Sequence, residues 1–169
     1  MLNTPVKRKL GEAKYFLMMM KKNYSDDRLF GYNLSAFLSA ARSITFYLQT
    51  QYKKQDGFSN WYERKQQIMS SDLELEFFNK ARVEAVHKRP SPYMLRRTQK
   101  ISFDPSIEQI REREKKGLPH IPQKMIIGEP KTIKRFFPDL DEVDVIEFCE
   151  TQLIKIEKIV KECENLFDN

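Results

Sequence analysis

The stretch FGYNLSAFLSAARSITFYL, residues 30–48, decides the fold. Its apolar side chains recur at alternating steps of four and three residues: Phe30, Leu34, Phe37, Ala41, Ile44 and Leu48. This period puts all of them on one face of a helix, so the stretch is predicted to be an amphipathic helix facing a core. Ser25-Asp26-Asp27 supplies a turn and an N-cap before the helix, and Gln55-Asp56-Gly57 ends it.

Other parts of the chain repeat this helical spacing. Helices are predicted from about Val6 to Tyr24, with Met20 packing in the core, and from Phe58 to Ser70, with Ile68 among the anchors. A further helix should begin at Ser71, where Ser71 and Glu74 have the spacing of a capping box, and end before Pro90. The last helix should run from about Asp139 to Phe167, with Val143 opening its buried stripe. The sum is a mainly α protein, an antiparallel four- or five-helix bundle forming one domain over residues 1–169.

Residues 88–138 have a different character, that of a proline-rich basic insertion before the last helix. Seven of the eight prolines of the chain lie here. Residues 106–116 have the charge spacing of a short helix. Residues 124–137 are predicted to form a short β-hairpin, two strands around a Gly128-Glu129-Pro130 turn.

The charges of the chain are unevenly distributed. Residues 88–138 carry thirteen Lys and Arg against five acids, a net charge of +8, whereas residues from Asp139 onward have a net charge of −7. This asymmetry suggests a polyanion site, an internal electrostatic clasp, or both, and a solvated charged surface is the plainer alternative. For a nucleic-acid site the candidate residues are Lys88, Arg89, Arg96, Arg97 and Lys100, and Tyr93, Phe103 and Phe136 are candidate stacking surfaces for bases.

Several classes of protein and of site are disfavoured. No apolar run is long enough for a membrane span and no secretory signal precedes the first helix, so we expect a cytoplasmic protein without a membrane partner. Cys149 and Cys163 are expected to be buried free thiols. No metal-ligand spacing, Gly-rich phosphate loop or nucleophile elbow is present, and the sequence predicts no metal and no cofactor.

The candidate chemistry lies at the end of the fourth predicted helix, where Arg82 and His87 precede Pro90. An arginine can hold a phosphate in bidentate fashion. A histidine, with an ordinary pKa of about 6.5, can take a proton from a ribose 2′-hydroxyl or return one to the leaving oxygen. The five-residue step turns an ideal helix by about 140°, so the two side chains converge only if the helix loosens at its end. The alternatives are a salt bridge for Arg82 and a helix-dipole contact for His87.

Here the sequence resembles the HEPN superfamily, small helical bundles that often act as ribonucleases. The resemblance rests on the Arg-x4-6-His motif of that superfamily, matched by Arg82 and His87, on residues 34–45, and on Trp61-Tyr62-Glu63 and Phe77-Phe78. It implies a metal-independent endoribonuclease of toxin or phage-defence type whose site is completed at a homodimer interface. In that case Arg82 is the phosphate ligand and His87 the general acid and base.

A second hypothesis is a non-catalytic helical module for dimerisation or protein interaction. Val83 favours it, because active HEPN members commonly have a polar residue directly after the arginine. The small residues Ser35, Ala36, Ser39, Ala40 and Ser43 would let another helix approach. Arg42, which lies among them, is either solvated or has a carboxylate or phosphate partner. RNA, a second copy of the chain and a protein partner therefore all remain as expected partners.

Overall fold

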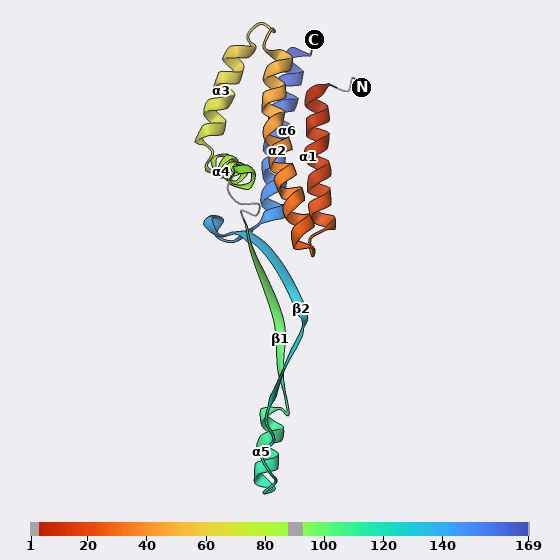
Figure 1. Cartoon of the computed structure of the whole chain (residues 1–169). Helices are drawn as coiled ribbons and strands as arrows, with labels where there is room; N and C mark the ends of the chain where they lie inside the picture. Colours follow the sequence, from red (N-terminus) through yellow and green to blue (C-terminus); the bar gives the residue numbers. More distant parts are fainter. Residues whose placement is uncertain (1–3, 88–92, 169) are drawn as a thin grey trace. The chain divides into compact units, whose positions relative to one another are not determined.

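A computed structural model describes residues 4–87 and 93–168, with side chains described except at 86–87, 99–101 and 129–131. This part of the chain is mainly helical, as predicted, with a small antiparallel sheet (Figure 1). Its elements are α1 (Pro5–Lys22), α2 (Asp27–Tyr52), α3 (Phe58–Ser71), α4 (Leu73–His87), β1 (Met94–Asp104), α5 (Ile107–Lys115), β2 (Lys124–Phe137), η1 (Pro138–Leu140), β3 (Val143–Asp144) and α6 (Val145–Phe167).

The helices begin at residues whose side chains accept backbone N–H groups. The Thr4 hydroxyl accepts from the amide of Lys7 at the start of α1, and the Asp26 carboxylate accepts from the amide of Leu29 at 2.8 Å, as the predicted cap of α2 requires. The start of the last helix was predicted wrongly. Pro138 begins the 3₁₀ helix η1, Asp141 and Glu142 have positive φ angles, and Asp144 then caps α6.

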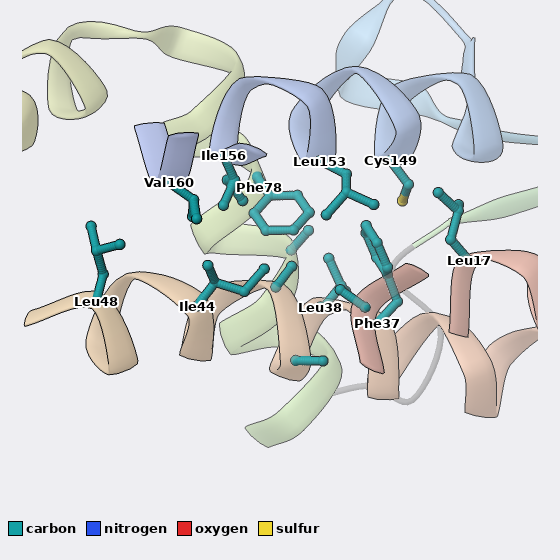
Figure 2. Packing of buried hydrophobic residues seen from close by; sticks show 14 of the residues in the cluster. Leu17, Phe37, Leu38, Ile44, Leu48, Phe78, Cys149, Leu153, Ile156 and Val160 are labelled. Atoms are coloured by element: carbon teal, nitrogen blue, oxygen red, sulfur yellow. The ribbon is translucent and has the colours of Figure 1, made fainter. Parts of the chain in front are cut away.

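The core of the helical part is built from the predicted stripes. The α2 stripe residues from Phe30 to Leu48 are all fully buried at 0% exposure. Figure 2 shows Phe37, Ile44 and Leu48 of this stripe facing Cys149, Leu153, Ile156 and Val160 of α6, with Phe78 of α4 between the two helices. Ile68 was a wrong anchor, because α3 buries only Phe58, Trp61 and Tyr62 near its N-terminus and leaves Ile68 59% exposed.

Three ion pairs join α1 to α6, which run side by side with α2 in Figure 1. Lys7 pairs with Glu164, Lys14 with Glu157 and Lys21 with Glu150. Both partners step by seven residues, upward along α1 and downward along α6, so the two helices are antiparallel. Glu162 of α6 likewise pairs with Lys65 of α3 at 2.7 Å.

The structure divides the chain into two compact units, residues 1–94 with 136–169 and residues 95–135. The second unit holds most of β1 and β2 with α5 between them, and Thr98 and Thr132 form a hydrogen bond across the strands. The short helix was predicted correctly, with Ser106 as its N-cap in a capping box. The hairpin within 124–137 was wrong, because β2 is one continuous strand through Gly128 and its partner is β1.

The end of β2 belongs to the first unit. Phe136 and Phe137 pair antiparallel with Asp144 and Val143 of β3. Phe137 is fully buried and packs edge-on against Phe77 of α4 and Phe148 of α6. Val143, predicted as the first buried residue of the last helix, is instead 36% exposed on this strand. Among the described residues, every helix is too short or too polar to cross a membrane.

Candidate functional site at the end of α4

The first turn of α4 is capped by Asp72 and not by Ser71. The Asp72 carboxylate accepts the backbone N–H groups of Glu74 and Leu75 at 3.0 and 3.1 Å, whereas the Ser71 hydroxyl donates backward to the carbonyl of Ile68. Ser71 is still the last residue of α3, so the capping oxygen comes from the next residue. The predicted capping box is therefore wrong by one position.

Lys155 of α6 fixes this end of α4. Its Nζ lies 2.7 Å from Asp72 Oδ2 and 2.8 Å from Glu74 Oε2, and the fully buried Gln152 donates to the same Glu74 oxygen at 2.9 Å. Hydrogen bonds from Lys155 and Gln152 lower the pKa of Glu74. Burial opposes ionisation of Asp72, but the hydrogen bonds from Lys155 and the α4 backbone outweigh it and lower the pKa of Asp72. The N-terminus of α4 is thus held by charge.

The middle of α4 is held by apolar packing. Leu75, Phe78 and Ala81 are buried, and the Phe78 ring contacts Phe37 of α2 edge-on at a centroid distance of 6.0 Å. Phe78 also packs on Phe148 of α6 at 6.4 Å. Because Phe78 packs against core helices on both sides, α2 and α6, the direction of α4 is fixed before its last two turns. Those turns carry the candidate residues.

Arg82 lies in these last turns and is partly buried. It follows Phe78 by four residues and Asn79 by three, so it shares a helix face with both. No hydrogen bond or ion pair joins its guanidinium to any residue that the structure describes. The salt-bridge alternative for Arg82 therefore finds no partner in the described residues.

His87 is the last residue of α4, as expected from Pro90, but its side chain lies outside the described residues. Lys88 and Arg89 lie outside them altogether, as does the side chain of Lys100. Convergence of Arg82 and His87 is therefore a prediction that remains open.

The described basic candidates are Arg96 and Arg97, both exposed on β1 in the second unit. The three stacking candidates differ from one another in exposure. Phe103 is 46% exposed, but Phe136 is only 5% exposed, and Tyr93 packs edge-on against Phe30 and donates to Asp27 at 2.9 Å. The structure thus removes Phe136 as a stacking surface, because its ring is buried, and leaves Phe103 exposed.

The two cysteines are free and buried, as predicted. Burial raises the pKa of the Cys163 thiol to about 12, and burial also raises the pKa of Cys149 well above its ordinary value. Neither thiol therefore ionises near neutral pH, which excludes both as nucleophiles under those conditions. In the part of the chain that is described, no group of His, Cys, Asp and Glu side chains has the arrangement of a metal site.

Among the described residues, two hollows share Asn79 of α4, and the sequence did not reveal them. The first, of about 430 Å³, opens between α2, α3 and α4 and is bordered by Arg42, Gln66 and Asn79. The second, beside it on α4, is lined by Glu76, Asn79, Lys80, Val83 and Glu84. Val83, which follows the candidate arginine, is 40% exposed here, and the backbone position of His87 is one turn farther along the same face.

Comparison with known families gives one assignment. A family described as bacteriophage lambda protein ea47 matches residues 3–89, more than half of the chain. The chain belongs to the ea47 family. No curated protein and no solved structure matches it.

The region matched to the ea47 family runs from α1 to the end of α4 and includes both Arg82 and His87. It leaves out β1, β2 and α5 and also α6, whose side chains complete the core around α2. The candidate site therefore lies inside the part of the chain that defines its family.

Proposed function

We propose that this ea47-family protein is a HEPN-like helical bundle that cleaves RNA without a metal, with Arg82 and His87 as its reacting groups. Arg82 holds the scissile phosphate and the negative charge that develops on it. His87 takes the proton of the ribose 2′-hydroxyl as its oxygen bonds to phosphorus. The bond from phosphorus to the 5′-oxygen then breaks, and that oxygen leaves with a proton from a second histidine, that of a partner copy. The products are a 2′,3′-cyclic phosphate and a 5′-hydroxyl.

One observation supports this proposal most strongly: within the described residues, the guanidinium of Arg82 has no hydrogen-bond or ion-pair partner. Among the described residues, its nitrogens are not among the buried side-chain atoms that lack a partner, so the guanidinium is accessible to a ligand. A phosphate group supplies acceptors in the bidentate geometry that a guanidinium favours. The backbone that carries Arg82 is held in place, because Lys155 anchors the start of α4 by an ion pair and Phe78 packs its middle against the core.

The distribution of ion pairs supports a polyanion as the partner. Four glutamates of α6 are held by lysines of α1 and α3, which removes them as internal partners for basic residues elsewhere. Residues 95–135 contain eleven Lys and Arg against five acids, and Arg97 is exposed on β1. Such a charged segment attracts RNA in a salt-dependent manner.

The test is cleavage of a mixed RNA pool in EDTA by the full-length protein. We expect the wild type to cut and to leave cyclic phosphate ends, and His87→Ala and Arg82→Ala to be inactive. Each variant has a matched control: His120→Ala changes the other histidine, and Arg64→Ala removes an exposed arginine from α3. Intact RNA with the wild type at a concentration where it is dimeric, or cutting that survives His87→Ala, would overturn the proposal.

A second candidate function, a dimerisation module, is favoured by the outer face of α2. Tyr32 and Phe46 are 63% and 64% exposed, and their fourteen-residue spacing puts them on one side of the helix. Ser39 lies midway between them, so an antiparallel second copy would bring each Tyr32 onto a Phe46. Phe46→Ser should lower the dimer fraction in analytical ultracentrifugation while the exposed-site control Tyr15→Ser leaves it unchanged. An unchanged dimer fraction in Phe46→Ser would exclude this face.

A further inference from the structure

The hollow between α2, α3 and α4 has an apolar floor and a polar rim. Its floor is made by Ala41, Leu75, Phe78 and Ile156, each no more than 8% exposed, and Figure 2 shows Phe78 and Ile156 close together in the core beneath it. Its volume of about 430 Å³ falls in the range of small-molecule sites, which are mostly apolar with a few well-placed polar groups. The hollow is lined by residues of α2, α3, α4 and α6, so its shape is set by the packing of these helices.

The polar rim has unused hydrogen-bonding capacity. The side-chain amides of Gln66 on α3 and Asn79 on α4 make no hydrogen bond with any described residue. Arg42 of α2 donates from Nη1 to Thr45 Oγ1 at 2.6 Å, which orients its guanidinium at the hollow, and within the described residues it has no carboxylate partner. Its other N–H groups are therefore available to a ligand.

This combination of groups matches a nucleobase. Each amide offers one acceptor and two donors, the complement of the polar edge of a base, and the apolar floor accepts the face of the ring. An apolar peptide side chain would fill the floor equally well, but it would form no hydrogen bond with the two amides or the guanidinium, whereas a base would use them. The rim therefore selects for a flat ligand with polar edges.

The hollow also lies close to the proposed phosphate ligand. Arg82 follows Asn79 by three residues, a rise of about 4.5 Å along the helix, on the face of α4 that carries Phe78 and Asn79. A base and the phosphate attached to its ribose are separated by a span of this order. We propose that the hollow binds one nucleobase of single-stranded RNA, adjacent to the phosphate held by Arg82, an assignment that rests on the proposed function.

Met69, which lines the hollow, gives a direct readout. The experiment records the methionine methyl signals of the full-length protein by NMR, in EDTA, while each of the four ribonucleoside 5′-monophosphates is added. Met69→Leu assigns the signal, and Met18, 54% exposed on α1, is the internal reference. We expect at least one nucleotide to shift the Met69 methyl saturably, with Met18 unchanged and ribose 5-phosphate without effect at the same concentration.

Rim variants test which groups read the base. Gln66→Ala and Asn79→Ala should each weaken nucleotide binding about tenfold, the equivalent of one hydrogen bond. Gln67→Ala is the matched control, because Gln67 is the exposed neighbour of Gln66 and does not line the hollow. All three positions are exposed, so the variants should retain the wild-type circular dichroism spectrum.

The outcomes separate this site from the proposed reaction. A Met69 signal that stays fixed with every nucleotide, or equal affinities of Gln66→Ala and Gln67→Ala, overturns the base site, whatever the RNA cleavage assay shows. An equal response to ribose 5-phosphate also overturns it, because the phosphate alone would then account for binding. Nucleotide binding by His87→Ala at wild-type affinity supports the base site even where cleavage is lost or absent.

Discussion

The clamp formed by Lys155 makes the most specific prediction about stability. Lys155→Met removes two charge-assisted hydrogen bonds, to Asp72 and Glu74, while a side chain of similar length keeps the packing of its stem. The exposed fractions of the three side chains are 30%, 29% and 50%, so solvent screens the pairs in part. We therefore expect a loss of about 1.5 kcal/mol, between the values for exposed and for buried charged pairs.

A double-mutant cycle separates the ion pair from the helix cap. Asp72→Asn keeps the side-chain oxygen that accepts the amides of α4 but removes the charge, since Asn is also a good N-cap. Urea unfolding is followed by the fluorescence of Trp61, the single tryptophan of the chain, which is buried in α3. The coupling free energy between Lys155→Met and Asp72→Asn should be about 1 kcal/mol.

The same clamp sets a pH dependence. The pKa values of Asp72 and Glu74 are lowered in the folded protein, so at acidic pH the unfolded chain binds more protons. Their contribution is complete above their ordinary values of about 4 and is lost as pH falls through the lowered values. Despite the cost of burial, the two carboxylates raise the pKa of Lys155, so its contribution is lost only as pH rises beyond its ordinary value of about 10.4.

Lys155→Met should flatten the acid side of this profile, whereas Lys158→Ala, at an exposed position of the same helix, should leave it as in the wild type. A coupling free energy below about 0.3 kcal/mol would refute the argument. An acid profile unchanged in Lys155→Met would refute it as well, because the shifts of both carboxylates depend on the lysine.

Three further predictions concern the core and the helix pairs. Phe78→Ala should cost about 3–5 kcal/mol in urea unfolding, against less than about 0.5 kcal/mol for the exposed Ile154→Ala. The two buried thiols should resist a thiol reagent at pH 8 and react in full once urea unfolds the chain, because burial raises the pKa of both. Lys14→Glu should lower stability by several tenths of a kcal/mol, and the added Glu157→Lys should restore it; a double variant weaker than the single one would show that this pair carries no attraction.

The helices could be predicted from the sequence because their signals are local. The α2 stripe from Phe30 to Leu48 needs only a repeated step of four and three residues, and every stripe position proved buried. The N-cap of a helix is also a local signal, but its exact position is harder to predict. Ser71 and Asp72 are both good capping residues, and which of them caps α4 depends on where α3 ends.

The strands were predicted poorly for a related reason. Gly128 and Pro130 are typical turn residues, yet β2 passes through both. A strand tolerates proline where one of its edges has no partner strand. The short strand β3 pairs with β2 only at Phe136 and Phe137, so it does not reach the edge of β2 at Pro130. The partner strand β1 lies some thirty residues away in sequence, as the contact between Thr98 and Thr132 shows. No local pattern in either segment indicates that the two strands pair.

The candidate site divides in the same way. Arg82 and the end of α4 at His87 follow from a motif and a nearby proline, which the sequence shows directly. The base-sized hollow depends on Arg42, Gln66 and Asn79, one from each of three helices, and such convergence is visible only once the helices are packed. The seven-residue steps of Lys7, Lys14 and Lys21 were a readable signal of the α1–α6 pairing that sequence reasoning missed.

The pairing of α1 with α6 has a consequence for synthesis of the chain on the ribosome. Lys7 is made long before its partner Glu164, so α1 and α6 cannot meet until the whole stretch between them and α6 itself have emerged. At about 5–20 residues per second, the apolar faces of α1 and α2 wait on the order of ten seconds for α6 to cover them. A nascent chain ending after α4 would carry the whole family-defining region and still lack the helix that closes its core.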